Sequence, residues 1–197
     1  MDQNSPVNVD QRRKLDSQIR ESYGRVVYTQ KTHDMDAIIL EKREKRLKTT
    51  QLIFSTIVAG AFLIVLFGNN QFATIIGTII SMFLLFLTTF MREFDFDGNA
   101  RKHRNVAQTL WVIREDYISL IADMDGLEIE DIRKSRDELQ LRTSEIYSNA
   151  PITSAKAYKM AQRALKVNEE LTFSEDEIDH LLPNELRKKP KRGERDL

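Results

Sequence analysis

The chain has 197 residues, of which 30 are basic, 30 are acidic and 3 are histidine, and it contains no cysteine. The balance of charge excludes a protein-wide field directed at nucleic acid or at an acidic substrate, and the lack of cysteine excludes disulfides and zinc–thiolate sites. A mean hydropathy of −0.42 would suit a soluble protein, yet no charged residue or histidine occurs between Thr49 and Met91. Composition therefore divides the chain into one apolar window and two charged flanks.

The flank before the window is polar and has no apolar core that would make it a signal peptide. Residues 1–18 are predicted to be disordered. Residues 19–48 are predicted to form a cytoplasmic helical segment that leads into the membrane, because Ile19, Tyr23 and Val26 recur at helical spacing. The basic side chains next to the window suit an anchor to anionic headgroups better than a nucleic-acid site; they are Lys42, Arg43, Lys45, Arg46, Lys48 and, after the window, Arg92.

The window itself predicts two transmembrane helices, over residues 49–67 and 72–91. A hydrocarbon core of about 30 Å needs about 20 residues of helix, and each segment has that length. The alternative is a buried pair of helices in a soluble protein, but helices of this length normally carry charge on one face. Residues 68–71, Gly-Asn-Asn-Gln, are too few for anything except a turn between antiparallel helices. The window therefore predicts a transmembrane helical hairpin.

The charges beside this hairpin set its expected orientation. Basic residues crowd both long flanks, whereas the turn at 68–71 has no charge. Cytoplasmic segments of membrane proteins carry an excess of lysine and arginine. Both termini are therefore expected in the cytoplasm and the turn on the external side. Four uncharged residues leave no room for an external domain, so we expect a switch to act from the cytoplasmic side.

The second predicted span combines small and hydroxyl side chains. Ala73, Gly77 and Ser81 recur every four residues, a spacing that lets helix backbones approach closely. Hydroxyl side chains share one face of the same helix, at Thr74, Thr78, Ser81 and Thr88. These residues could form a helix–helix seam in which the hydroxyls bond to carbonyls of the preceding turn. They could instead line a pore, which would require several subunits because one hairpin encloses no channel. Spacing alone favours the seam.

Residues 92–182 are predicted to form a cytoplasmic helical region. The segment Asp95-Phe96-Asp97-Gly98 lacks the later ligands of a calcium loop and is interpreted as a turn before a helix. Helices are expected over about 99–124 and 128–147, where apolar residues repeat at helical spacing, and over 154–171. Ser174 and Glu177 have the spacing of a capping box, which predicts a short further helix. Residues 183–197 are expected to form a basic, mobile tail.

No pattern in the chain predicts an enzyme site. There is no glycine-rich nucleotide motif, and His33, His103 and His180 lie far apart in the sequence with no ligand spacing, so each is interpreted as a surface or packing residue. No metal or cofactor is expected. Arg101, Lys102 and Arg104 could meet a phosphate group, although salt bridges to nearby acids are the favoured use. The fold class that follows is all-α and integral to the membrane, with long cytoplasmic helices before and after the hairpin.

This architecture resembles a known family. A charged helix enters a close pair of spans, FDFDGNARKHRNVAQTLWVIREDYISLIADM follows, and EIYSNAPITSAKAYKMAQRAL comes after a charged helix. The pattern is similar to the SLATT domain, a two-transmembrane effector domain associated with nucleotide-synthesising and nucleotide-sensing proteins in bacterial conflict systems. The resemblance covers about residues 20–170, and its strongest local carriers are the hairpin and YSNAPITSAKAY, from Tyr147 to Tyr158.

The resemblance implies a bacterial inner-membrane effector in anti-phage defence, which would oligomerise, disrupt the membrane and arrest or kill the cell. It implies a regulatory partner, such as an enzyme making a cyclic nucleotide or a reverse transcriptase encoded nearby, and a cyclic nucleotide as candidate ligand. With this function, the hydroxyl face is expected to line a pore in the assembled state. The alternative is a non-conducting membrane scaffold whose cytoplasmic helices dock a soluble partner. Membrane potential during expression would separate these two hypotheses.

Overall fold

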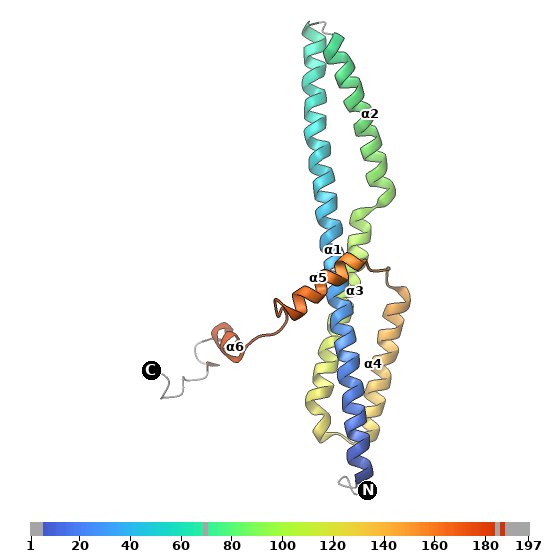
Figure 1. Cartoon of the computed structure of the whole chain (residues 1–197), viewed down its shortest axis with the longest axis vertical. Helices are drawn as coiled ribbons and strands as arrows, with labels where there is room; N and C mark the ends of the chain where they lie inside the picture. The colour runs from blue at the N-terminus through green and yellow to red at the C-terminus, as the bar shows by residue number, and fades with distance from the viewer. Residues whose placement is uncertain (1–5, 69–70, 184–185, 188–197) are drawn as a thin grey trace, which may run out of the picture. The chain divides into compact units, whose positions relative to one another are not determined.

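The computed structural model describes residues 6–68, 71–183 and 186–187. These residues form helices and connecting turns without any strand, so the predicted all-α class is confirmed (Figure 1). The elements, in chain order, are α1 (Pro6–Gly68), α2 (Gln71–Phe94), α3 (Phe96–Asp123), the 3₁₀ turn η1 (Met124–Gly126), α4 (Ile129–Asn149), α5 (Ala155–Lys166) and α6 (Glu175–Leu181). The chain divides into two compact units, residues 1–161 and 162–197.

Helix α1 begins much earlier than the sequence predicts. The expected disorder of residues 1–18 is wrong for residues 6–18, which are helical, whereas residues 1–5 lie outside the described part. Two features stabilise this first stretch. Leu15 is buried in the core of the first unit, and Arg12 donates to the carbonyl oxygens of Met124 and Leu127. A charged composition was interpreted as disorder, but the apolar residue within it packs on a distant part of the chain.

The lower part of α1 packs with α3 and α4 as a three-helix bundle (Figure 1). Residues at helical spacing on each helix supply its core, which excludes water from their side chains. The largest fully buried residues of this core are Ile19 and Val26 of α1, Leu110, Ile113 and Tyr117 of α3, and Ile132 of α4. Polar contacts flank the core, including the hydrogen bond of 2.8 Å from Arg136 to Gln18 and the ion pair of 2.9 Å between Arg142 and Asp116. Buried apolar side chains at the centre and polar contacts around them thus set the arrangement of the three helices.

The apolar end of α1 lies beside α2, and we call these two stretches the apolar pair (residues 49–68 and 71–91; Figure 1). Phe54 and Phe83 meet edge to face with ring centroids 5.3 Å apart. A Cβ atom on Gly77 would lie 3.7 Å from the Cβ of Ala61, so the small residue sets a close approach of the helices. In the most apolar 18-residue windows of the two helices, 0% and 6% of the residues are buried. Surfaces this apolar and this exposed suit lipid rather than water.

A sharp junction separates α2 from α3. Asp95 adopts the left-handed region with φ 38°, and its side chain accepts a hydrogen bond of 3.1 Å from the backbone N–H of Gly98. A Cβ atom at Gly98 would lie 2.0 Å from a carboxylate oxygen of Asp95, so only glycine fits under this cap. The structure therefore places a helix cap where the sequence predicts a turn before a helix, and α3 begins at Phe96.

The second unit, residues 162–197, contains the end of α5 and helix α6. Helix α5 ends at Lys166, earlier than the predicted end at residue 171, because Glu169 and Leu171 adopt positive φ angles of 51° and 74°. Ser174 and Glu177 form the predicted capping box at the start of α6. Residues 188–197, which include most of the predicted basic tail, lie outside the described part, as do residues 69–70 of the predicted external turn.

Candidate functional site

The hydroxyl side chains predicted on one face of α2 are all exposed in the single chain. Thr78 Oγ1 donates to the carbonyl of Thr74 and Ser81 Oγ donates to the carbonyl of Gly77, each at 2.8 Å. Thr88 differs, because its Oγ1 accepts a hydrogen bond of 3.0 Å from Gln51 Nε2 of α1. Donation to the preceding turn satisfies the hydroxyl proton and leaves an oxygen lone pair on the helix surface. The face is therefore weakly polar and carries no charge.

The small residues of α2 do not act together as a single row. Ala73 and Gly77 are half-buried on the side of α2 that faces α1, whereas Ser81 is exposed. At about 100° per residue, the hydroxyl face is about 80° wide and lies about a quarter turn away from that α1-facing side. Leu85 falls within the hydroxyl face and interrupts it. The seam inside one chain therefore uses Gly77 and, at the edge of the hydroxyl face, Thr88, whereas Thr78 and Ser81 lie exposed beside that seam.

Basic residues surround the base of the apolar pair. All the predicted membrane-anchoring side chains are exposed, and they are Lys42, Arg43, Lys45, Arg46 and Lys48 of α1 and Arg92 in the last turn of α2. Lys48 forms an ion pair of 2.6 Å with Glu44. The Arg43 guanidinium lies over the ring of Phe96, 5.6 Å from its centroid. Exposed cations and aromatic rings at the end of an apolar segment suit contact with phosphate headgroups.

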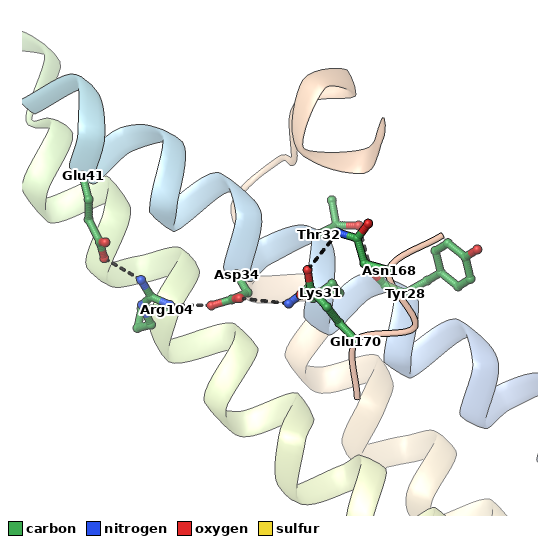
Figure 2. A network of polar contacts seen from close by, with 8 residues as sticks. All are labelled: Tyr28, Lys31, Thr32, Asp34, Glu41, Arg104, Asn168 and Glu170. Carbon is green, nitrogen blue, oxygen red and sulfur yellow. Dashed lines mark hydrogen bonds and ion pairs between the residues drawn. The ribbon is translucent and has the colours of Figure 1, made fainter. Parts of the chain in front are cut away.

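The predicted ligand contacts Arg101, Lys102 and Arg104 differ in their surroundings. Figure 2 shows Arg104 of α3 between two carboxylates of α1. Its guanidinium contacts Asp34 and lies 2.8 Å from Glu41. The contact with Glu41 contributes most to raising the pKa of Arg104, and the contact with Asp34 adds to this shift. Arg101 pairs with Asp97 at 2.5 Å, and Lys102 is exposed. Arg104 thus ties α3 to α1 with its charge balanced, which is the use that sequence analysis favoured over a phosphate contact.

Two histidines that are 70 positions apart in sequence form a buried pair between α1 and α3. His33 Nδ1 lies 2.9 Å from His103 Nδ1, and both side chains are almost fully buried. Two ring nitrogens at this distance share one hydrogen bond, so one ring donates and the other accepts. Burial, together with the neighbouring His103, lowers the pKa of His33 to about 4, although Asp36 opposes the shift. Burial likewise lowers the pKa of His103, again opposed by Asp36. The pair is therefore neutral at physiological pH.

The buried carboxylate of Asp36 connects α1 to the start of α5. One oxygen accepts from the backbone N–H of Ser154 at 2.8 Å, and the other accepts from the Ser154 hydroxyl at 2.6 Å. Ser154 Oγ in turn accepts from the N–H of Ala157, which caps α5. Ala157 and Ala161 are fully buried, as the predicted small-residue face of this helix requires. The Asp36 side chain of α1 thus holds Ser154, where the connection from α4 ends and α5 begins.

Sequence reasoning missed both the histidine pair and the Asp36 contact. The distance between His33 and His103 along the chain gives no sign that the two side chains meet. Helical periodicity carried the missing signal, because His103 shares a face with Ala100, Ala107 and Leu110, all buried. Among the described residues no group of three histidine, cysteine or acidic side chains could hold a metal ion. The contacts described above are interhelical contacts and a polar face on an apolar helix.

These features define a class: an all-α membrane protein with two helices that are long and apolar enough to cross a bilayer. The family follows from a match to a family model over residues 15–177. The chain belongs to the SMODS and SLOG-associating 2TM effector domain family 4, SLATT_4. The resemblance to the SLATT domain drawn from the sequence is thereby confirmed. No curated protein and no solved structure matches the chain.

Proposed function

We propose that the protein is a membrane effector of a bacterial anti-phage defence system. In this proposal several copies assemble in the inner membrane, form a pore or disrupt the bilayer, and arrest or kill the cell. The observation that carries the proposal is the exposed hydroxyl face of α2, where Thr78 and Ser81 lie beside the seam with α1 and Thr88 bonds to α1 at the edge of the face. Membership of a two-transmembrane effector family supports it. A polar face on a lipid-exposed helix is best used against water or against another copy.

The proposed mechanism is a change in how the apolar pairs pack. Within one chain, α2 meets α1 through Gly77 and through the hydrogen bond between Gln51 and Thr88. In a closed assembly, the hydroxyl face would lie against a neighbouring copy. In an open assembly, the same face would line a water-filled path, because its oxygen lone pairs accept hydrogen bonds from water. The exposed Leu85 within the face would then form a narrow apolar ring, which can gate a pore by excluding water.

The proposed topology places both termini in the cytoplasm. The support is the contrast between basic flanks and an uncharged turn. A regulatory partner, such as a nucleotide-synthesising enzyme or a reverse transcriptase, would then act on the bundle from the cytoplasm, with a cyclic nucleotide as candidate signal. The cysteine-free chain allows a direct test by replacing Asn69 with cysteine. A maleimide that cannot cross membranes should label this residue from the periplasm in cells with an intact inner membrane, and labelling only after lysis would overturn the topology.

The pore is tested by removing hydroxyls without changing side-chain shape. We expect the double variant Thr78→Val, Ser81→Ala to reduce the depolarisation of expressing cells several-fold, because valine and alanine cannot hydrogen-bond to water. The matched control is Thr56→Val, since Thr56 on α1 also donates to its own helix, at 3.0 Å from the Leu52 carbonyl. A dye sensitive to membrane potential reports the result, with membrane content of each variant checked in parallel. Full depolarisation by the double variant would exclude this face as the pore wall.

The alternative is a non-conducting scaffold that docks a soluble partner on its bundle. The finding that favours it is the internal satisfaction of the α2 hydroxyls, as expected for helices that only pack. An unchanged membrane potential at high expression, together with normal insertion, would support the scaffold. The same preparation in mild detergent gives the particle mass, which is one copy for a simple anchor and several copies for a pore.

A further inference from the structure

The hydroxyl face of α2 continues beyond the apolar pair and ends on a charged residue. Its positions are separated alternately by four and three residues and are all exposed; they are Thr74, Thr78, Ser81, Leu85, Thr88 and Arg92. Helix α2 continues without interruption to Phe94. At about 3.6 residues per turn, about five full turns separate Thr74 from Arg92, so both side chains leave the helix at the same angle. Arg92 therefore belongs to the hydroxyl face as well as to the basic residues at the base of the apolar pair.

The charge of Arg92 is not balanced by a contact. Within the part of the chain that the structure describes, no acidic side chain pairs with it. Glu93 follows it directly in the sequence, but this position lies about 100° away around the helix and outside the face. Asp95 caps α3 instead, because its carboxylate accepts a hydrogen bond of 3.1 Å from the backbone N–H of Gly98. Arg92 thus adds an unpaired cation to a face whose other members are uncharged.

We propose that Arg92 forms a ring of positive charge at the cytoplasmic mouth of the pore and makes the pore selective for anions. This inference rests on the pore of the proposed function, and it names the class of ion that the pore conducts. All copies enter the membrane in the same orientation, so the symmetry axis of their assembly runs along the membrane normal. Arg92 of every copy then lies at one depth, about 6 Å along α2 beyond Thr88. A hydroxyl face that lines the path brings these guanidinium groups to its end.

The chemistry of the face assigns the selectivity to Arg92. A ring of arginine side chains attracts anions to a pore and repels cations, and the surrounding lipid concentrates this field in the water-filled path. The hydroxyl protons of Thr78 and Ser81 are already donated to carbonyls of their own helix. These hydroxyls offer lone pairs to water but no donor to an anion, so an anion passes them with its hydration shell. Discrimination between ions of opposite charge is therefore expected at Arg92.

Selectivity for anions agrees with the loss of membrane potential expected under the proposed function. The interior of a bacterial cell is electrically negative, so an open anion path lets anions leave the cell. Their departure removes negative charge from the interior and depolarises the membrane. A positive ring at the cytoplasmic mouth raises the local concentration of anions on the side from which they leave.

Ion permeability tests the inference in the full chain. Membrane patches excised from giant spheroplasts of expressing cells are held under a KCl gradient, and the reversal potential gives the ratio of chloride to potassium permeability. The native chain should pass chloride several-fold better than potassium. Arg92→Gln should bring the ratio close to one while current persists, and Arg92→Glu should favour potassium. Arg92→Lys keeps the charge and should keep the preference for chloride.

The matched control removes the same charge from the same end of the apolar pair but not from the hydroxyl face. Arg46 of α1 is also exposed and lies close to the start of the apolar stretch. Arg46→Gln should leave the ratio of permeabilities unchanged. Maleimide labelling of cysteine at position 69 in each variant verifies that the loss of a basic residue has not inverted the topology. An equal fall in the ratio for Arg46→Gln would assign the selectivity to general surface charge and overturn the role of Arg92.

The outcomes for selectivity and for the pore can be told apart. A current that prefers potassium in the native chain would overturn the anion selectivity and leave the pore in place. An unchanged ratio in Arg92→Gln would do the same for the assignment to Arg92. Patches without current, from cells in which the native chain is inserted normally, would contradict the pore and the selectivity together.

Discussion

The bundle and the apolar pair are held together in different ways. In the bundle, contacts between distant residues specify the geometry: the His33–His103 pair, the Arg104 ion pairs and the hydrogen bonds of Asp36 to Ser154. In the apolar pair, two apolar helices are joined by close packing at Gly77 and by the hydrogen bond between Gln51 and Thr88. Directional buried contacts allow one arrangement, whereas apolar helices in lipid can pack in several arrangements of similar energy.

The difference suits the separate tasks that the proposed function gives to the two regions. In that proposal the bundle receives and transmits the signal as a rigid body, because its helices cannot slide without breaking buried hydrogen bonds. The apolar pair has the freedom to change its neighbours, as the proposed pore requires. Helix α1 belongs to both regions without interruption, whereas the second connection passes through the left-handed junction at Asp95. Movement of the bundle would therefore reach the membrane through α1 as a rod and through α2 as a hinged arm.

The largest expected contrast comes from truncating leucines in the two regions. Leu110→Ala should lower the free energy of unfolding by about 2–5 kcal/mol, because the side chain is fully buried in the bundle and leaves a cavity. Leu85→Ala, at a residue that is 71% exposed on the apolar pair, should cost far less. Denaturant titration of the full chain in detergent, followed by circular dichroism, measures both. Equal losses in the free energy of unfolding would show that the two regions unfold together. They would also show that side-chain packing stabilises both regions to the same extent.

The next contrast concerns Asp36. Asp36→Ala removes two hydrogen bonds from Ser154 and should cost about 1–3 kcal/mol, the range for hydrogen bonds to a carboxylate. Hydrogen exchange should rise mainly in α5, whose first turn this contact holds. The control is Asp16→Ala, which breaks an exposed pair with Arg20 on α1 and should cost less than about 0.5 kcal/mol. Uniform exchange across the bundle in Asp36→Ala would contradict a local role.

Local sequence patterns predicted the helices and the capping box, because those features depend on residues a few positions apart. The helical structure of residues 6–18 was missed for the opposite reason. Leu15 packs on a core that includes Met124, and Arg12 bonds to carbonyls more than a hundred positions away, so no window around either residue contains the cause. The same holds for His33 and His103. Pairing between helices depends on rotation and depth, which a single sequence fixes only through the fold as a whole.

The candidate site shows the same limit. The hydroxyl face at Thr74, Thr78, Ser81 and Thr88 was predictable because it lies on one helix with one period. The division between the face and the seam was not, since it depends on which side of α2 meets α1. Gly77 was grouped with Ser81 by spacing, but packing separates them. Shape complementarity with Ala61 decides this, and spacing along α2 contains no information about α1.

The histidine pair predicts a pH dependence confined to the bundle. In the unfolded chain each histidine binds a proton near pH 6.5, whereas the folded pair resists protonation, with a pKa of about 4 for His33. Stability should therefore be full above pH 6.5 and fall as the pH drops from 6.5 to about 4, by up to about 1.4 kcal/mol per pH unit for each proton taken up on unfolding. Melting temperatures measured across this range provide the test.

Two variants isolate this effect from the titration of carboxylates. The double variant His33→Phe, His103→Phe replaces both imidazoles with rings that do not titrate and should flatten the fall in melting temperature between pH 6.5 and 5. His180→Phe replaces an exposed histidine of α6 and should leave the fall as it is in the native chain. An equally steep fall in the double variant would show that other groups carry the pH dependence.

The smallest expected effect lies in the apolar pair, and it tests how weakly that region is specified. Gln51→Leu removes the hydrogen bond to Thr88 and should cost about 0.6 kcal/mol, the usual value for such bonds between membrane helices. A double-mutant cycle with Thr88→Val isolates the coupling between the two side chains, and Thr56→Val serves as the control because its hydroxyl bonds within α1. A coupling of several kcal/mol would mean that the pair is as tightly specified as the bundle. The apolar pair could then open only by breaking this bond, and Gln51 would have to be counted among the residues that hold the closed state.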